Sequence, residues 1–89
     1  MLKLDIKHRA TKFIKKLQPK HRRQVSGKIL ELQYNPLPSD SEQLTGFSYK
    51  RADIGEYRII YRVEGDTLRV PLIGKRNDDE VYRKLRRME

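Results

Sequence analysis

The chain begins with a short alternation of apolar and polar residues. Leu2, Leu4 and Ile6 are separated by Lys3 and Asp5. A period of two is typical of a β-strand that buries one face and leaves the other in water. We therefore predict a short strand at the N-terminus.

The apolar period then changes to one that fits a helix. Ala10, Phe13, Ile14 and Leu17 recur every three or four residues, which places an apolar stripe along one side of a helix. This pattern predicts a first helix from about His8 to Gln18.

A second helical stripe follows the break at Gln18-Pro19. Pro19 suits the first turn of a helix because its missing N–H is not needed there. Val25, Ile29 and Leu32 continue at helical spacing, and Asn35-Pro36 ends the pattern because the residue before a proline disfavours helix. Two basic helices joined by a tight break predict an antiparallel helical hairpin.

The second half of the chain returns to a period of two after a loop. The segment from Asn35 to Phe47 is rich in Pro, Ser, Asp and Gly, which predicts a loop. Pro71 cannot donate to a sheet ladder, so its strand should have an edge or a bulge there. The predicted strands cover residues 47–53, 56–63 and 67–73.

The C-terminal segment has a clear helical stripe. Val81, Leu85 and Met88 follow Asn77, a residue that can cap a helix. The element order is therefore β-α-α-β-β-β-α. It predicts an α+β fold in which a small antiparallel sheet of about four strands is flanked by an N-terminal helical hairpin and a C-terminal helix. We expect residues 1–89 to form a single domain.

Composition narrows the class of partner. Lys and Arg number 21 against 12 Asp and Glu, which gives a net charge of +9. Such a balance indicates nucleic acid or an acidic protein as the partner. The absence of cysteine excludes disulfides and cysteine-based zinc sites. No apolar stretch approaches the roughly 20 residues that span a membrane, so we expect a cytoplasmic protein with no membrane partner.

Basic residues and tyrosines interleave in the second half of the chain. Arginine binds phosphate through two parallel donors, and aromatic rings stack on unpaired bases, so this mixture suits single-stranded RNA. Solvated strand faces with tyrosines in the core are the alternative interpretation. No carboxylate cluster has metal-ligand spacing and no glycine-rich phosphate loop is present, so we expect neither a metal nor a cofactor. The basic residues are Lys50, Arg51, Arg58, Arg62, Arg69, Lys75 and Arg76, and the tyrosines are Tyr49, Tyr57, Tyr61 and Tyr82.

Three blocks of the sequence carry a family resemblance. "LTG", "GEYRIIYRV" and "IGKRNDDEVYRKL", in this order and spacing, resemble the C-terminal half of the RelE/ParE toxin superfamily. The resemblance implies a RelE-like fold and a bacterial toxin that cuts messenger RNA in the ribosomal A site. It also implies metal-independent attack by the 2′-OH on the adjacent phosphate, with the ribosome, messenger RNA and a cognate antitoxin as partners.

The resemblance also implies roles for three residues. Arg58 matches the strand arginine that contacts the scissile phosphate. Arg76 resembles the group proposed as the general acid toward the leaving 5′-oxygen. Tyr82, six residues later, resembles the residue that stacks on a base and orients the 2′-oxygen.

The preceding strand departs from the RelE pattern of two lysines. This chain has Arg51 and Asp53 there, with Lys50 adjacent. Arg51 can hold phosphate, but a guanidinium group stays protonated in proteins and is therefore a poor base. Asp53 is either the general base or an ion-pair partner of Arg51 or Arg58, and the sequence leaves both roles open. The candidate RNA-binding residues outside the catalytic set are Lys50, Arg62 and Lys75.

Two other functions remain open on the sequence. A ParE-like toxin shares the fold and inhibits DNA gyrase by binding, and an inactive copy would be a basic RNA-binding module. Arg58, Arg76 and Tyr82 together favour the nuclease, while the altered pair Arg51 and Asp53 keeps the gyrase inhibitor as an alternative.

Overall fold

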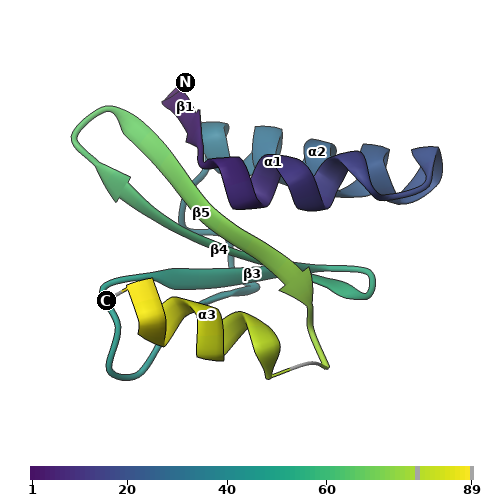
Figure 1. The fold of residues 1–89 in the computed structure, drawn as a ribbon. Coiled ribbons are helices and arrows are strands. Elements are labelled where there is room, and N and C mark those ends of the chain that lie inside the picture. The colour runs from purple at the N-terminus through teal and green to yellow at the C-terminus, as the bar shows by residue number, and fades with distance from the viewer. Residues whose placement is uncertain (78, 89) are drawn as a thin grey trace.

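Three helices and one sheet make up the structure, a computed structural model that describes residues 1–77 and 79–88. Helices α1 and α2 lie on one face of the sheet and α3 lies on the other (Figure 1). The elements are β1 (Lys3–Ile6), α1 (His8–Lys15), α2 (Pro19–Tyr34), β2 (Ser41–Gln43), β3 (Lys50–Ile54), β4 (Tyr57–Glu64), β5 (Thr67–Lys75) and α3 (Glu80–Met88).

The sheet has five strands in the order β1-β5-β4-β3-β2. The predicted α+β fold, with its helical hairpin and closing helix, is confirmed, but the sheet has one strand more than the predicted four or so. It is also mixed, because β1 runs parallel to β5 while the other neighbours are antiparallel. The helical hairpin between β1 and the later strands provides the long crossover that a parallel pair requires.

The additional strand, β2, lies in the segment predicted to be a loop. Ser41, Glu42 and Gln43 pair with β3, but none of them is apolar, so no alternation marks them as a strand. Two helix ends also differ from the prediction. The chain after Lys15 tightens through a hydrogen bond from the Leu17 N–H to the Ile14 carbonyl at 3.1 Å, and α1 ends before Gln18.

The start of α3 lies later than the sequence pattern suggested. Asn77 is in a turn, and the helix begins at Glu80. With Asn77 as the cap, Asp78 would fall in the first helical turn, but Asp78 lies outside the described residues. The amphipathic character of α3 is nevertheless as predicted, since Val81 and Leu85 are buried against the sheet.

Two hydrophobic clusters form, one on each face of the sheet. Ile59 and Tyr61 of β4 pack with Val25 and Ile29 of α2. Ile60, between them, packs on the opposite face with Leu85 of α3. The centre of β4 is therefore buried on both faces, which explains why its sequence there is a nearly continuous run of apolar residues.

A β-bulge changes the direction of side chains in β5. Ile60–Arg62 on β4 is matched by Arg69–Leu72 on β5, which contains one residue more. The edge or bulge predicted at Pro71 is thus confirmed, and β1 also ends opposite the preceding residue, Val70. Because the extra residue shifts the alternation, Val70 packs on the α1–α2 side while Leu72 packs on the α3 side.

Close approach of α3 to the sheet depends on Gly74. A Cβ atom at this position would lie 3.2 Å from the Cβ atom of Val81. The absence of a side chain on β5 at this point therefore lets the first turn of α3 pack directly onto the strand.

We predict that Leu85→Ala destabilises the fold by about 2–5 kcal/mol, the usual cost of a large-to-small change at a buried site. Leu85 is fully buried between α3 and the sheet. Urea-induced unfolding followed by circular dichroism measures the change. The control is Leu37→Ala, at a side chain that is 63% exposed, which should change stability by no more than about 0.5 kcal/mol. Equal effects of the two substitutions would contradict this account of α3 packing.

Candidate functional site

An ion pair between Asp53 and Arg58 forms the centre of the candidate site. The two residues lie directly opposite each other on β3 and β4. Arg58 Nε donates to Asp53 Oδ1 at 2.8 Å and Arg58 Nη2 donates to Asp53 Oδ2 at 3.1 Å. Both side chains are mostly buried, with 14% of Arg58 and 19% of Asp53 exposed. The two-point geometry holds the guanidinium group in one orientation.

Arg51 extends this pair toward the edge of the sheet. Its Nη1 donates to Asp53 Oδ2 at 3.0 Å, and its Nη2 donates to Glu42 Oε2 at 2.6 Å. Glu42 lies opposite Arg51 on the neighbouring strand β2. One carboxylate, Asp53, therefore binds two arginines and holds their guanidinium groups side by side.

Tyr82 brings α3 into the same cluster. Arg58 Nη1 donates a hydrogen bond to the Tyr82 hydroxyl, and the guanidinium carbon lies 5.7 Å from the centre of the tyrosine ring. Tyr82 is partly buried against the apolar residues beneath α3. The sequence-predicted pair Arg58 and Tyr82 is thus in direct contact.

Arg76 lies at the end of β5, beside the turn between β3 and β4. Its backbone N–H donates to the Glu56 carbonyl at 3.0 Å, and its Nη1 donates to the Gly55 carbonyl at 3.3 Å. The side chain is exposed, and its charge acts on Asp53. Arg76 therefore borders the cluster of Asp53, Arg58 and Tyr82.

The surrounding charges make Asp53 a weaker base than a free aspartate. Burial by itself would raise the pKa of Asp53, but the hydrogen bonds and charge of Arg58, together with the charges of Arg51 and Arg76, lower it below its ordinary value. The Asp53 hydrogen bonds in turn raise the pKa of Arg58. In this arrangement Asp53 is an ion-pair partner, one of the two roles that the sequence left open.

Of the three candidate RNA-binding residues, Arg62 and Lys50 lie outside this cluster, and Lys75 directly precedes Arg76. Arg62 donates to Ser48 Oγ at 2.9 Å, and its guanidinium carbon lies 4.7 Å from the centre of the Tyr49 ring. Lys50, which precedes Arg51 on β3, points to the opposite face of the strand by the alternation of side chains. Lys75 is exposed near the end of β5.

Glu42 is the residue of the cluster that sequence reasoning missed. It lies in a segment without apolar alternation and pairs with Arg51 only because β2 adds to the sheet at that position. No local signal in the sequence distinguishes Glu42 from any other surface carboxylate. Its contact becomes visible only when the strand order is known.

The structure also bears on metal and membrane contacts. Within residues 1–77 and 79–88, no three His, Asp or Glu side chains are close enough together to hold a metal ion. None of the described helices combines the length and apolar character that a membrane crossing needs.

Comparison with known proteins gives structural rather than sequence matches. No family model matches the sequence, and no curated protein matches it. A double variant of the E. coli toxin RelE in the free state is 26% identical with a TM-score of 0.80, over 99% of this chain and 98% of that chain. A chain of the RelE–RelB complex from Pyrococcus horikoshii is 25% identical with a TM-score of 0.74, over 84% of this chain and 94% of that chain. A YoeB/ParE toxin from Agrobacterium tumefaciens, 21% identical with a TM-score of 0.73 over 83% and 98% of the two chains, shares the fold.

We predict that Asp53→Asn flattens the loss of stability in acid. Because the pKa of Asp53 is lowered in the folded state, the unfolded chain takes up this proton first on acidification. The stabilisation is therefore complete above the unfolded pKa of about 3.9 and is lost as the pH falls through the lower, folded pKa. Urea unfolding of both proteins between about pH 6 and pH 2 measures the difference.

The control for this prediction is Arg58→Gln, which removes the main partner of Asp53. In that background Asp53→Asn should change the acid dependence much less than it does in the unaltered chain. If Asp53→Asn alters the pH dependence equally with and without Arg58, the ion pair is not the source of the effect.

Proposed function

We propose, on the premise that this chain belongs to the RelE/ParE toxin superfamily, that it is an endoribonuclease which cleaves messenger RNA on the ribosome. A cognate antitoxin is its protein partner, by analogy with the RelE–RelB complex of Pyrococcus horikoshii and the RelBE toxin–antitoxin complex of E. coli. The observation that supports the nuclease is the direct contact of Arg58 with Tyr82, beside a second arginine, Arg51, that shares its carboxylate partner.

The proposed reaction uses the RNA as its own nucleophile. The 2′-oxygen attacks the adjacent phosphorus and the bond from phosphorus to the 5′-oxygen breaks, which leaves a 2′,3′-cyclic phosphate and a 5′-hydroxyl. Arg58 and Arg51 bind the phosphate oxygens, where negative charge develops in the transition state. Arg76, exposed beside the cluster, acts as the general acid: it gives a proton to the leaving 5′-oxygen and regains one from solvent, while the 2′-proton is released to solvent.

Asp53 acts in this scheme by positioning arginines. Its lowered pKa makes it a poor acceptor for the 2′-proton, while its contacts fix Arg58 and Arg51 next to each other. Tyr82, held by Arg58, offers an aromatic face to a base and a hydroxyl to the ribose.

The ribosome supplies the orientation of the scissile bond that so small a site lacks. Neither His8 nor His21 belongs to the cluster, so precise orientation of the scissile bond has to come from outside. A messenger RNA held in the A site arrives with its conformation already restricted, and such positioning can contribute much of a rate enhancement. The net charge of +9 favours association with ribosomal RNA.

The decisive experiment is brief induction of the protein in cells, followed by mapping of new messenger RNA ends. We expect cuts in phase with codons and 2′,3′-cyclic phosphate at the upstream fragments. A supercoiling assay with purified DNA gyrase provides the contrast. Stalled gyrase without new RNA ends would contradict the nuclease and identify an inhibitor of the ParE type, and neither effect would indicate an inactive module.

We predict that Arg76→Ala relieves growth arrest without unfolding the protein. Loss of one donor to a developing negative charge typically lowers kcat about 10²–10³-fold, and Arg76 is exposed. Colony counts after induction, at matched expression, measure the effect. Arg86→Ala, an exposed arginine of α3, is the control and should remain toxic. Full toxicity of Arg76→Ala would remove Arg76 from the proposed machinery.

A further inference from the structure

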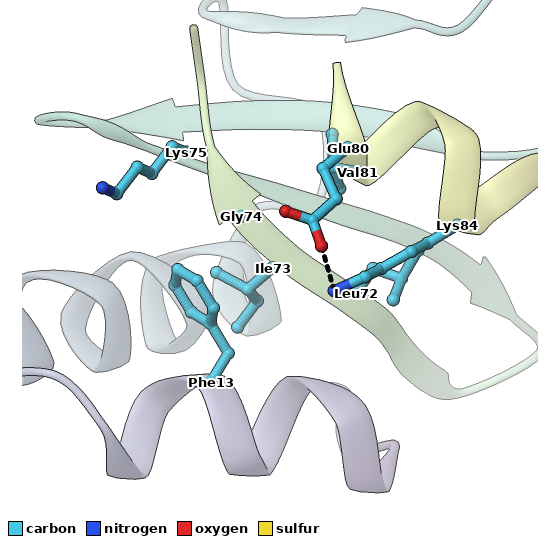
Figure 2. Close-up of a pocket in the computed structure, with 8 residues that line it drawn as sticks. All are labelled: Phe13, Leu72, Ile73, Gly74, Lys75, Glu80, Val81 and Lys84. Carbon is cyan, nitrogen blue, oxygen red and sulfur yellow. Dashed lines mark ion pairs between the residues drawn. The ribbon is translucent and has the colours of Figure 1, made fainter. Parts of the chain in front are cut away.

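A groove runs between α1 and α3 along the outer edge of β5. It consists of two adjoining cavities of about 210 Å³ and about 220 Å³ that share Phe13 and Lys84. β1 pairs with β5 only as far as Val70, so no strand of the described chain covers the outer edge of β5 from Pro71 to Lys75. Figure 2 shows the cavity of about 210 Å³, with Phe13 directed from α1 toward β5. We call these two cavities the α1–α3 groove.

Apolar side chains line part of the cavity drawn in Figure 2. Leu72, Ile73 and Val81 line it and are themselves nearly buried. Phe13 is partly exposed there and is fixed by edge-to-face contact with Tyr57, with the ring centres 5.9 Å apart. An aromatic ring held in place beside aliphatic side chains offers a surface on which a nucleobase can pack.

The rim of the groove is strongly basic. Among the residues that the structure describes, Glu80 is the one carboxylate that lines the groove, and it forms an ion pair with Lys84 at 3.0 Å, drawn as the dashed line in Figure 2. No ion pair joins any of the other basic residues of the rim to a carboxylate of residues 1–77 and 79–88. These other residues are Arg9, Lys12, Lys16 and Lys75.

The groove adjoins the candidate site. Gly74 lines the groove and lies opposite Arg58 in the β4–β5 pairing. Lys75 also lines the groove and precedes Arg76, and Val81 lines it and precedes Tyr82. The groove and the catalytic cluster are therefore built on the same segments of β5 and α3.

We propose that the α1–α3 groove binds single-stranded RNA that continues from the phosphate held at Arg58. Lys12 and Lys16, four residues apart at the end of α1, bind backbone phosphates, and a base packs against Phe13. An acidic peptide is the rival occupant, since it also suits a basic rim and an apolar floor. RNA is favoured because the groove adjoins the cluster proposed to bind a phosphate, and this proposal rests on that proposed function.

The test compares two charge-reversal variants of the full chain. Lys12→Glu/Lys16→Glu alters the groove, and Lys20→Glu/Arg23→Glu alters exposed positions of α2 outside it. Each pair of changes takes the net charge from +9 to +5, because each substitution replaces +1 by −1. The probe is a fluorescein-labelled 12-nucleotide 2′-O-methyl RNA, which lacks the attacking hydroxyl and cannot be cut.

We expect the groove variant to bind this RNA about ten-fold more weakly than the α2 variant in fluorescence anisotropy. The slope of log K against log salt should fall by about 0.7 for each lost phosphate contact. Equal weakening by both variants, or by neither, would overturn the proposal because the groove would then add nothing beyond general charge. Circular dichroism confirms that both variants are folded.

Two further outcomes distinguish other occupants and the nuclease itself. If the groove variant no longer binds a polyglutamate peptide or purified ribosomes but still binds the RNA, the groove binds an acidic protein or the ribosome, and the proposal fails. Codon-phased cuts by the unaltered chain together with unchanged RNA binding by the groove variant would refute the groove alone. If the groove variant alone binds RNA more weakly and the unaltered chain makes no cuts in messenger RNA, the nuclease proposal is refuted and the groove proposal stands.

Discussion

The ion pair between Asp53 and Arg58 is the interaction on which the arrangement of the site depends. It crosses from β3 to β4, and Arg58 continues to Tyr82 on α3. Asp53 also binds Arg51, which reaches Glu42 on β2. One mostly buried carboxylate therefore links three strands and a helix. Because an uncompensated charge in such a position is costly, the members of the cluster hold one another in place.

The charge balance of the cluster suits the ligand that we propose. Arg51, Arg58 and Arg76 carry three positive charges, and Asp53 and Glu42 carry two negative charges. The single remaining positive charge matches the single negative charge of one phosphodiester. Since Asp53 already occupies two donors of Arg58, an incoming phosphate either uses the remaining donors or competes with a carboxylate. The arginines are thus oriented before substrate arrives, which reduces the reorganisation needed on binding.

The sequence predicted those features of the fold that depend on residues close together in the chain. The helical stripes, the strand alternation and the missing N–H of Pro71 predicted every element except β2, in the right order, and an edge or bulge in β5. Non-local pairing lay beyond them, because neither the parallel contact of β1 with β5 nor the strand around Glu42 has a signature in its own residues. The role of Asp53 could not be predicted for the same reason. Whether it is a general base or an ion-pair partner depends on its contacts with the arginines, and these contacts are known only from the structure.

The position of α3 links the site to the core on that face of the sheet. Tyr82 reaches Arg58 from a helix whose Val81 and Leu85 are packed on the sheet, and the glycine at position 74 leaves room for Val81 to pack closely. A helix of nine residues is too short to be stable without such packing. The small apolar contact beneath α3 therefore sets both the geometry of the Arg58–Tyr82 pair and one wall of the α1–α3 groove. Apolar packing beneath α3 and the charged cluster are consequently parts of one structural unit.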